Sequence, residues 1–216
     1  MLLSAVISVR NLISVLLLTL LCGNSLAAEA DTPEKTILVL GDSISAGFGI
    51  PLQQGWVALL GKELQRSGAR VTLINASISG ETTSGGLNRL PQLLQQHQPQ
   101  LLILELGGND GLRGTPVKVI KNNLQRMISL TTQTKGDILL VGMQIPPNYG
   151  RKYSNLFREI FPTLASKNAT RLVPFLLEDV ATKPAMMQPD GIHPTAAAQP
   201  LMMQQVLPEV QSWLSP

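Results

Sequence analysis

The segment that decides the fold is residues 36–50, which read TILVLGDSISAGFGI. Its first five residues are almost all isoleucine, leucine and valine. Such a short, continuous apolar run predicts a strand that is buried on both faces. The run stops at Gly41 and Asp42, residue types that begin turns. Strands buried on both faces belong to parallel sheets covered by helices, so this stretch indicates an α/β fold.

Four later runs repeat this pattern, and helical patterns separate them. The expected strands are Thr36–Leu40, Arg70–Asn75, Leu101–Leu106, Asp137–Gly142 and Arg171–Phe175. The expected helices are Trp56–Ser67, Leu87–Gln96, Val117–Thr132, Asn155–Lys167 and a last one from Thr195 towards Trp213, which Pro200 and Pro208 should kink or break. This alternation predicts an α/β sandwich around a parallel five-stranded sheet, with ligands at the carboxyl ends of the strands.

Residues 1–28 have the pattern of a cleaved secretory signal. Arg10 is the only charged residue among them, and a leucine-rich run covers Leu12–Leu21. The segment Ser25-Leu26-Ala27-Ala28 then provides small residues at the spacing that a signal peptidase accepts. The apolar run is short for a membrane anchor, which needs about 20 residues. Lipid attachment at Cys22 is a minor alternative, because a leucine and not a small residue precedes it.

The remaining residues, 29–216, are expected to form one domain that is periplasmic or secreted, monomeric and without a stable membrane anchor. The chain of 216 residues is 44% hydrophobic and 14% charged, which excludes a disordered protein. Its net charge is +3 without a cluster of Lys and Arg, so nucleic acid is not an expected partner. Two histidines, one cysteine and an incomplete dinucleotide motif in AGFG predict neither a metal nor a cofactor.

Ser43 is the candidate nucleophile. A hydroxyl at a strand-to-helix turn is exposed, and the helix N-terminus behind it favours developing negative charge. The local alternative is a helix N-cap, a position that Ser and Asp both favour. The spacing also differs from the G-x-S-x-G turn of the α/β-hydrolases, since Ser45 takes the place of the second glycine.

A serine nucleophile needs a base, and the chain offers two histidines. His97 lies in the polar string QQHQPQ and is expected at the solvated surface. His193 follows Asp190 by three residues in DGIHP, so this carboxylate can orient the imidazole from the same loop. The alternative is an ordinary turn that holds an Asp and a His by chance.

Three turns that follow predicted strands carry candidate donors for an oxyanion. These donors are the N–H of Ser43, the N–H of Gly80 in SISGE and the side-chain amide of Asn109 in GGND. Taken singly, each residue has a simpler explanation, because Gly and Asn are the usual turn residues. The coincidence of three such turns at one edge of a sheet favours the functional interpretation.

Four blocks stand in order along the chain, namely GDSISAGFG, NASISGETTSGG, LELGGNDGLRG and DGIHP. In this combination the sequence resembles the GDSL/SGNH hydrolase family. The resemblance implies a three-layer α/β/α sandwich of the flavodoxin-like type. It implies that Ser43 is the nucleophile, His193 the base and Asp190 its orienting acid. It also implies an oxyanion hole formed by Ser43, Gly80 and Asn109.

The same resemblance implies hydrolysis of carboxylic esters and thioesters of acyl chains, as in an arylesterase, thioesterase or lysophospholipase. The residues expected to contact the substrate are Gly111, Leu112, Ile145, Pro146 and Tyr149, in the loop after GGND and in the segment after the fourth strand. From their placement near the serine, Ile44 and Phe48 are further candidates to contact an acyl chain, although an ordinary core position suits Ile44 better.

Two other functions are compatible with the sequence. One is a carbohydrate O-deacetylase of the same fold, which would use the same machinery on a polar substrate. The other is an inactive, secreted lipid-binding module. The complete catalytic set is evidence against the module, and an aromatic content of only 4% is evidence against sugars, which often stack on aromatic rings.

Overall fold

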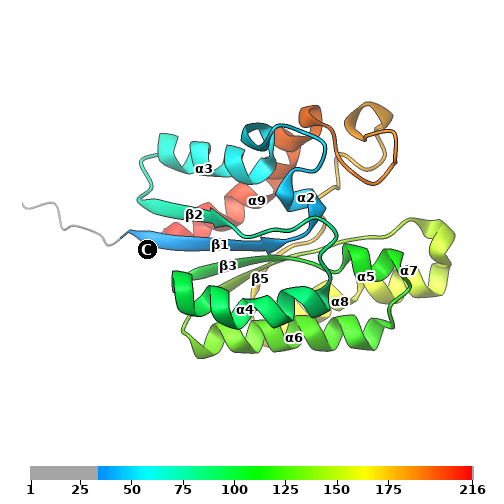
Figure 1. Ribbon diagram of the computed structural model, residues 1–216, viewed down its shortest axis with the longest axis horizontal. Coiled ribbons are helices and arrows are strands. Elements are labelled where there is room, and N and C mark those ends of the chain that lie inside the picture. Colours follow the sequence, from blue (N-terminus) through cyan, green and yellow to red (C-terminus); the bar gives the residue numbers. More distant parts are fainter. Residues whose placement is uncertain (1–33, 216) are drawn as a thin grey trace, which may run out of the picture. The chain divides into compact units, whose positions relative to one another are not determined.

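A computed structural model describes residues 34–215 (Figure 1). The predicted signal segment, with Cys22, lies outside the described residues. Among the helices of residues 34–215, none is long and apolar enough to span a lipid bilayer.

Five parallel strands form one sheet in the described part of the chain, as predicted. They are β1 (Lys35–Gly41), β2 (Val71–Asn75), β3 (Leu101–Glu105), β4 (Asp137–Val141) and β5 (Arg171–Val173). The order across the sheet is β2-β1-β3-β4-β5, so β1 has β2 on one side and β3 on the other. The winding reverses next to β1, and the crevice outside the carboxyl ends of β1 and β3 is where such sheets bind ligands.

Helices cover both faces of this sheet and give three layers (Figure 1). One face carries α3 (Trp56–Arg66) and α9 (Gln199–Leu214), and the other carries α4 (Thr83–His97), α6 (Val117–Gln133) and α8 (Ile160–Asn168). Alternate residues of β1 face opposite layers. Ile37 and Val39 pack towards α3 and α9, whereas Leu38 and Leu40 pack towards α4 and α6. The predicted three-layer α/β/α fold is confirmed.

Shorter elements connect these layers. The helices α2 (Ser43–Ala46) and α5 (Gly108–Leu112) follow β1 and β3 directly. Short 3-10 turns lie at Leu52–Gln54, Pro147–Tyr149, Pro184–Met186 and Ala196–Ala198.

The expected helix Asn155–Lys167 is in fact two helices, α7 (Arg151–Arg158) and α8, which meet at Glu159. Pro162 has no N–H to donate to the carbonyl of Arg158, so the helical ladder of hydrogen bonds cannot continue through this point.

The last helix, in contrast, was expected to be kinked or broken at its two prolines, but α9 is one continuous helix. Pro200 lies in the first turn of α9, where a backbone N–H has no helical partner anyway, and Pro208 lies inside the helix. Met202, Val206 and Val210 are fully buried on both sides of Pro208. Their packing on the sheet offsets the hydrogen bond that Pro208 cannot donate.

Candidate active site

The turn after β1 presents the hydroxyl of Ser43. Asp42 is the N-cap of α2, because its Oδ1 atom accepts from the N–H of Ile44 at 3.0 Å. The cap is therefore Asp42 and not Ser43, which leaves the serine hydroxyl free for another partner. A side chain at residue 41 would collide with Glu105, since a Cβ at Gly41 would lie 2.6 Å from Oε2 of Glu105.

Glu105 supports this turn from inside the protein. Its side chain is fully buried, and its Oε2 atom accepts from Asp42 N–H at 3.2 Å and from Ser45 Oγ at 2.6 Å. Burial and the nearby charge of Asp42 raise the pKa of Glu105 well above 4.5, and burial raises the pKa of Asp42 to about 6. Glu105 was not predicted as a site residue, although a carboxylate inside the buried run LLILELGG is an anomaly that marks it.

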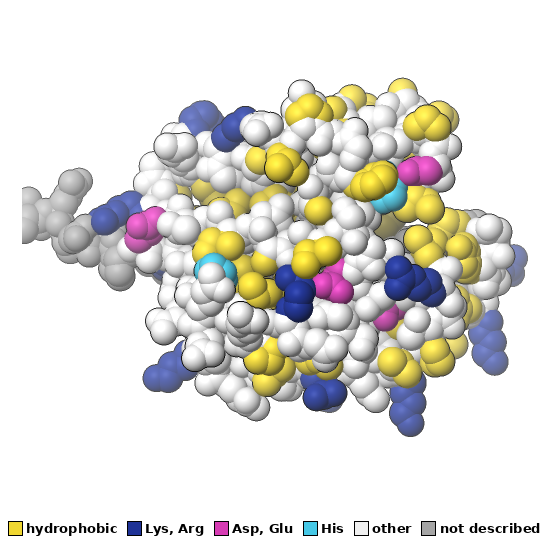
Figure 2. Space-filling model, in the orientation of Figure 1, with side chains coloured by type: hydrophobic (Ala, Val, Ile, Leu, Met, Phe, Trp, Pro, Cys, Tyr) yellow, Lys and Arg dark blue, Asp and Glu magenta, His cyan; other side chains and the backbone are white. Residues whose placement is uncertain are grey.

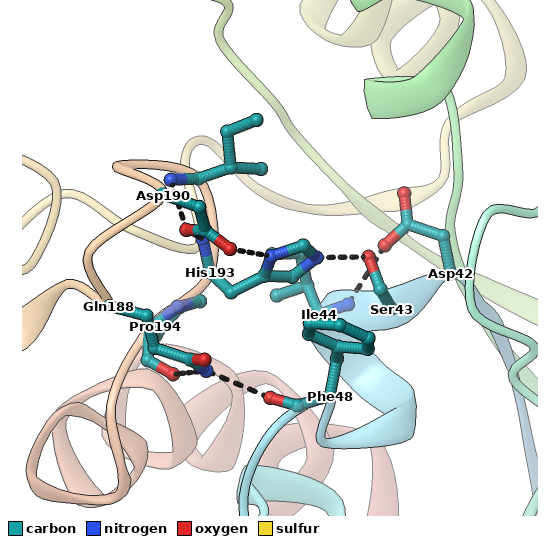
Figure 3. Close-up of polar contacts among 9 residues, drawn as sticks. Asp42, Ser43, Ile44, Phe48, Gln188, Asp190, His193 and Pro194 are labelled. Carbon is teal, nitrogen blue, oxygen red and sulfur yellow. Dashed lines mark hydrogen bonds and ion pairs between the residues drawn. The ribbon is translucent and has the colours of Figure 1, made fainter.

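Asp190 and His193 lie on one loop, residues 187–194, and reach Ser43 (Figure 3). His193 Nε2 is 2.9 Å from Ser43 Oγ, and His193 Nδ1 is 2.7 Å from Asp190 Oδ2. The backbone N–H groups of Ile192 and His193 donate to Asp190 Oδ1 at 2.9 and 3.0 Å. Led by the one from His193 N–H, these hydrogen bonds lower the pKa of Asp190 from 3.8 to about 2.

His97, the other histidine of the chain, lies away from this group. It is the last residue of the 15-residue helix α4, whose first turn is at the site because Thr83 N–H donates to Asp110 Oδ2 at 2.8 Å. A helix of this length spans roughly 20 Å. Only His193 of the two can therefore act on Ser43.

Asn109 and Gly80 lie next to the Ser43 turn on two further loops. Asn109, in α5, donates from Nδ2 to Asp42 Oδ2 at 3.1 Å and to the carbonyl of Glu81 at 3.0 Å. Gly80 has a φ of +80°, a left-handed conformation that favours glycine. The backbone N–H groups of Ser43 and Gly80 donate to no acceptor within residues 34–215, so both can serve a ligand.

The turn that carries Gly80 is held in place from both sides. Ile78 N–H donates to the carbonyl of Gly41 at 3.1 Å, which fixes the turn to the end of β1. Arg89 of α4 forms an ion pair with Glu81 at 2.8 Å and donates to the carbonyl of Ala76 at 3.0 Å. The Gly80 N–H thus has a defined position relative to the serine.

The predicted substrate-contacting residues line the edge beyond α5 and β4. Gly111 and Ile145 are buried against each other, since a Cβ at Gly111 would lie 2.7 Å from Ile145 Cγ2. Leu112 is half-buried, and Pro146 and Tyr149 are exposed. Figure 2 shows hydrophobic side chains gathering over this edge of the sheet, where the strands end.

The two apolar residues after the serine differ from each other. Phe48 is 49% exposed, and its ring lies over His193 with ring centroids 4.4 Å apart (Figure 3). Ile44 is partly buried and packs against the core between the sheet and α3, in agreement with the core position that the sequence favours for it.

This arrangement is suited to acyl transfer. A hydroxyl, an imidazole and a carboxylate in one hydrogen-bonded row can remove the hydroxyl proton during attack on a carbonyl. Nearby N–H groups can hold the oxyanion that forms. Within residues 34–215, no three His, Cys, Asp or Glu side chains come together as a metal site.

Residues 39–200 match the GDSL-like lipase/acylhydrolase family. The chain belongs to this family. It is 48% identical over 194 residues to an arylesterase of Vibrio mimicus, covering 90% of this chain and 96% of the relative. It is 42% identical over 185 residues to thioesterase 1/protease 1/lysophospholipase L1 of Escherichia coli K12, covering 86% of each chain. This GDSL-like chain is an acyl hydrolase that acts on ester bonds.

The fold of this GDSL-like hydrolase is also that of a solved relative. The structure of the psychrotrophic esterase EstA from Pseudoalteromonas sp., inhibited by monoethylphosphonate, matches it with a TM-score of 0.80. The two chains are 40% identical, and the match covers 83% of this chain and 98% of that one.

Proposed function

We propose that this acyl hydrolase cleaves carboxylic esters and thioesters of acyl chains, with Ser43 as nucleophile, His193 as base and Asp190 as the acid that orients the base. The observation that carries the proposal is the row of contacts from Asp190 through His193 to Ser43, at 2.7 and 2.9 Å. The names of the relatives, an arylesterase and a thioesterase/lysophospholipase, support this substrate class.

Acylation begins when Ser43 Oγ attacks the carbonyl carbon and its proton moves to His193 Nε2. The carboxylate of Asp190 keeps the ring in the orientation that exposes Nε2 and stabilises the imidazolium. The imidazolium then gives its proton to the leaving alcohol or thiol as the C–O or C–S bond breaks. The acyl group remains on Ser43 as an ester.

Deacylation repeats these steps with water as the nucleophile. Water attacks the acyl carbonyl and gives a proton to His193 Nε2. The proton passes to Ser43 Oγ as the carboxylic acid leaves, which restores the starting state.

The oxyanion of both steps is held by the N–H groups of Ser43 and Gly80 and by Asn109 Nδ2. The two N–H bonds of Asn109 already have acceptors, Asp42 Oδ2 and the carbonyl of Glu81. The oxyanion therefore competes with one of these acceptors, and its full negative charge favours it over the neutral carbonyl.

The substrate enters over the apolar edge described above. Gly111, Leu112 and Ile145 would contact the acyl chain, with Pro146 and Tyr149 further out. We also propose that the enzyme is periplasmic or secreted and keeps no membrane anchor, because residues 1–28 have the pattern of a cleaved signal. We further propose that it works as a monomer. Cell fractionation tests the location of the expressed chain, and size-exclusion chromatography tests its oligomeric state.

Purified protein and its Ser43→Ala variant should be assayed on nitrophenyl esters of graded chain length, acyl thioesters and acetylated sugars. Ser166→Ala is a matched control, since Ser166 is exposed on α8. We expect turnover of acyl esters and thioesters that Ser43→Ala abolishes and the control retains. Turnover confined to acetylated sugars would instead identify a deacetylase, and turnover that does not depend on Ser43 would refute the mechanism.

A further inference from the structure

The loop that carries the acid and the base is a closed unit. Gln188 N–H donates to the carbonyl of His193 at 2.7 Å, and Met187 pairs with Pro194 in an antiparallel bridge. The contacts of Asp190 with His193 also lie within this loop. The geometry of the acid relative to the base is therefore set locally. These contacts within the loop do not determine the position of His193 relative to Ser43.

A side chain from this loop reaches the polypeptide that carries the nucleophile. Gln188 Nε2 donates to the carbonyl of Phe48 at 2.8 Å and to the carbonyl of Pro194 at 3.0 Å (Figure 3). Phe48 N–H in turn donates to the carbonyl of Ser43 at 3.1 Å. One amide thus joins the residue after the base to a residue that is hydrogen-bonded to the nucleophile.

The nucleophile loop is shaped to receive this side chain. A Cβ at Gly49 would lie 2.4 Å from Gln188 Oε1, and Gly49 has a φ of +74°. The ring of Phe48, the residue before Gly49, lies over the ring of His193. An amide is needed here because both acceptors are carbonyl oxygens, which require the two N–H bonds of one NH₂ group.

We infer that Gln188 is a positioning residue that sets the distance between His193 Nε2 and Ser43 Oγ. The inference rests on the proposed function, in which that contact transfers the proton. A catalytic group that is displaced by about 1 Å loses up to about 100-fold in rate. The side-chain amide of Gln188 donates to the carbonyls of Phe48 and Pro194 and to neither of the two reacting atoms, so we expect its effect on kcat and not on substrate affinity.

The test compares Gln188→Ala and Gln188→Glu with the wild-type enzyme. The glutamate variant has nearly the same shape but cannot donate two hydrogen bonds to the carbonyls, so it isolates the donors. Gly49→Ala disturbs the same contact from the other loop. Gln211→Ala is the control, because Gln211 is exposed on α9. The fraction of active enzyme is measured by titration with a phosphonate, so that kcat can be given per active site.

We expect kcat per active site to fall about 10- to 100-fold in both Gln188 variants, with KM and the control little changed. We also expect faster hydrogen exchange of the 187–195 backbone in these variants, a readout that does not need activity. An unchanged kcat per active site would refute the inference even if total activity fell, because that loss would reflect misfolding alone. Unchanged hydrogen exchange would refute it too. A wild-type enzyme without Ser43-dependent turnover would instead refute the proposed function.

Discussion

Asn109 Nδ2 lies 3.1 Å from Asp42 Oδ2, so the side-chain amide of α5 is fixed against the carboxylate that precedes the nucleophile. The same nitrogen donates to the carbonyl of Glu81, next to Gly80. Asn109 therefore joins the three turns that carry the proposed oxyanion donors. This nitrogen links the turns in the free enzyme. In the proposed mechanism it exchanges the carbonyl of Glu81 for the oxyanion.

Asn109→Ala should lower kcat about 100- to 1000-fold, because one preorganised donor to the oxyanion is lost. KM should change little, since the donor acts mainly in the transition state. Steady-state kinetics on a nitrophenyl ester measure both constants. Asn122→Ala, at an exposed position of α6, is the matched control. A kcat close to that of the wild type would exclude Asn109 from the oxyanion hole.

Asp190→Asn should lower kcat by roughly two to four orders of magnitude, because the amide does not stabilise the imidazolium. Kinetics at neutral pH, with Asp179→Asn as an exposed control, measure this loss. Full activity of Asp190→Asn would mean that another group orients His193.

Asp190 also makes folding stability depend on pH. The pKa of Asp190 is lowered from 3.8 to about 2 on folding. Its carboxylate therefore stabilises the fold at pH values above 3.8, and this contribution disappears as the pH falls towards about 2. The Tm difference between wild type and Asp190→Asn should therefore shrink as the pH falls from about 4 towards about 2. A difference that did not change over this range would contradict the lowered pKa.

Glu105→Gln should become more stable relative to the wild type as the pH rises. The pKa of Glu105 is raised well above 4.5, so the folded protein retains a proton that the unfolded chain releases above that pH. The stability of the wild type therefore falls with rising pH, by at most about 1.4 kcal/mol per pH unit from this group, whereas the amide does not titrate. Thermal unfolding from about pH 4.5 to about pH 8 measures the difference.

For Glu105, the matched control is Glu159→Gln, at an exposed position between α7 and α8. This variant shows what the change from a carboxyl to an amide group does at an exposed position. If the Tm difference for Glu105→Gln did not vary with pH, the carboxyl group would be ionised in the folded protein, contrary to the effect of its burial.

Gly111→Ala should destabilise the protein by about 1 to 3 kcal/mol through overpacking. Its Cβ would lie 2.7 Å from Ile145 Cγ2 and 2.9 Å from the ring of Phe157, and both side chains are buried and cannot move freely. Pushing Ile145 towards the substrate should also shorten the longest acyl chain that is accepted. Tm and chain-length profiles measure the two effects, with Gly61→Ala in α3 as the control. An unchanged Tm would contradict the close packing of α5.

The sheet and the positions of the site turns follow from the sequence for simple reasons. Leu38 and Val39 lie in a short apolar run that predicts a strand buried on both faces, and the carboxyl ends of parallel strands share one edge. Ser43 and Asn109 come directly after such strands. His193 could be chosen because the chain offers only one other histidine.

The features that were missed depend on partners distant in the sequence. Gln188 contacts Phe48 at a separation of 140 residues, and no local pattern indicates such a pair. Pro208 was expected to kink or break the last helix, but α9 continues through it, with Val206 and Val210 buried on either side. Glu105 could have been found, because a carboxylate in a buried apolar strand must have donors nearby.

The most direct test of the central claim is the identity of the residue that becomes acylated. The enzyme is mixed with a nitrophenyl ester, quenched in acid and digested, and the acylated peptide is identified by mass spectrometry. The mechanism predicts an acyl group on Ser43, which is absent from Ser43→Ala and accumulates when deacylation is slowed. An acyl group on another residue, or turnover by Ser43→Ala at the wild-type rate, would contradict it.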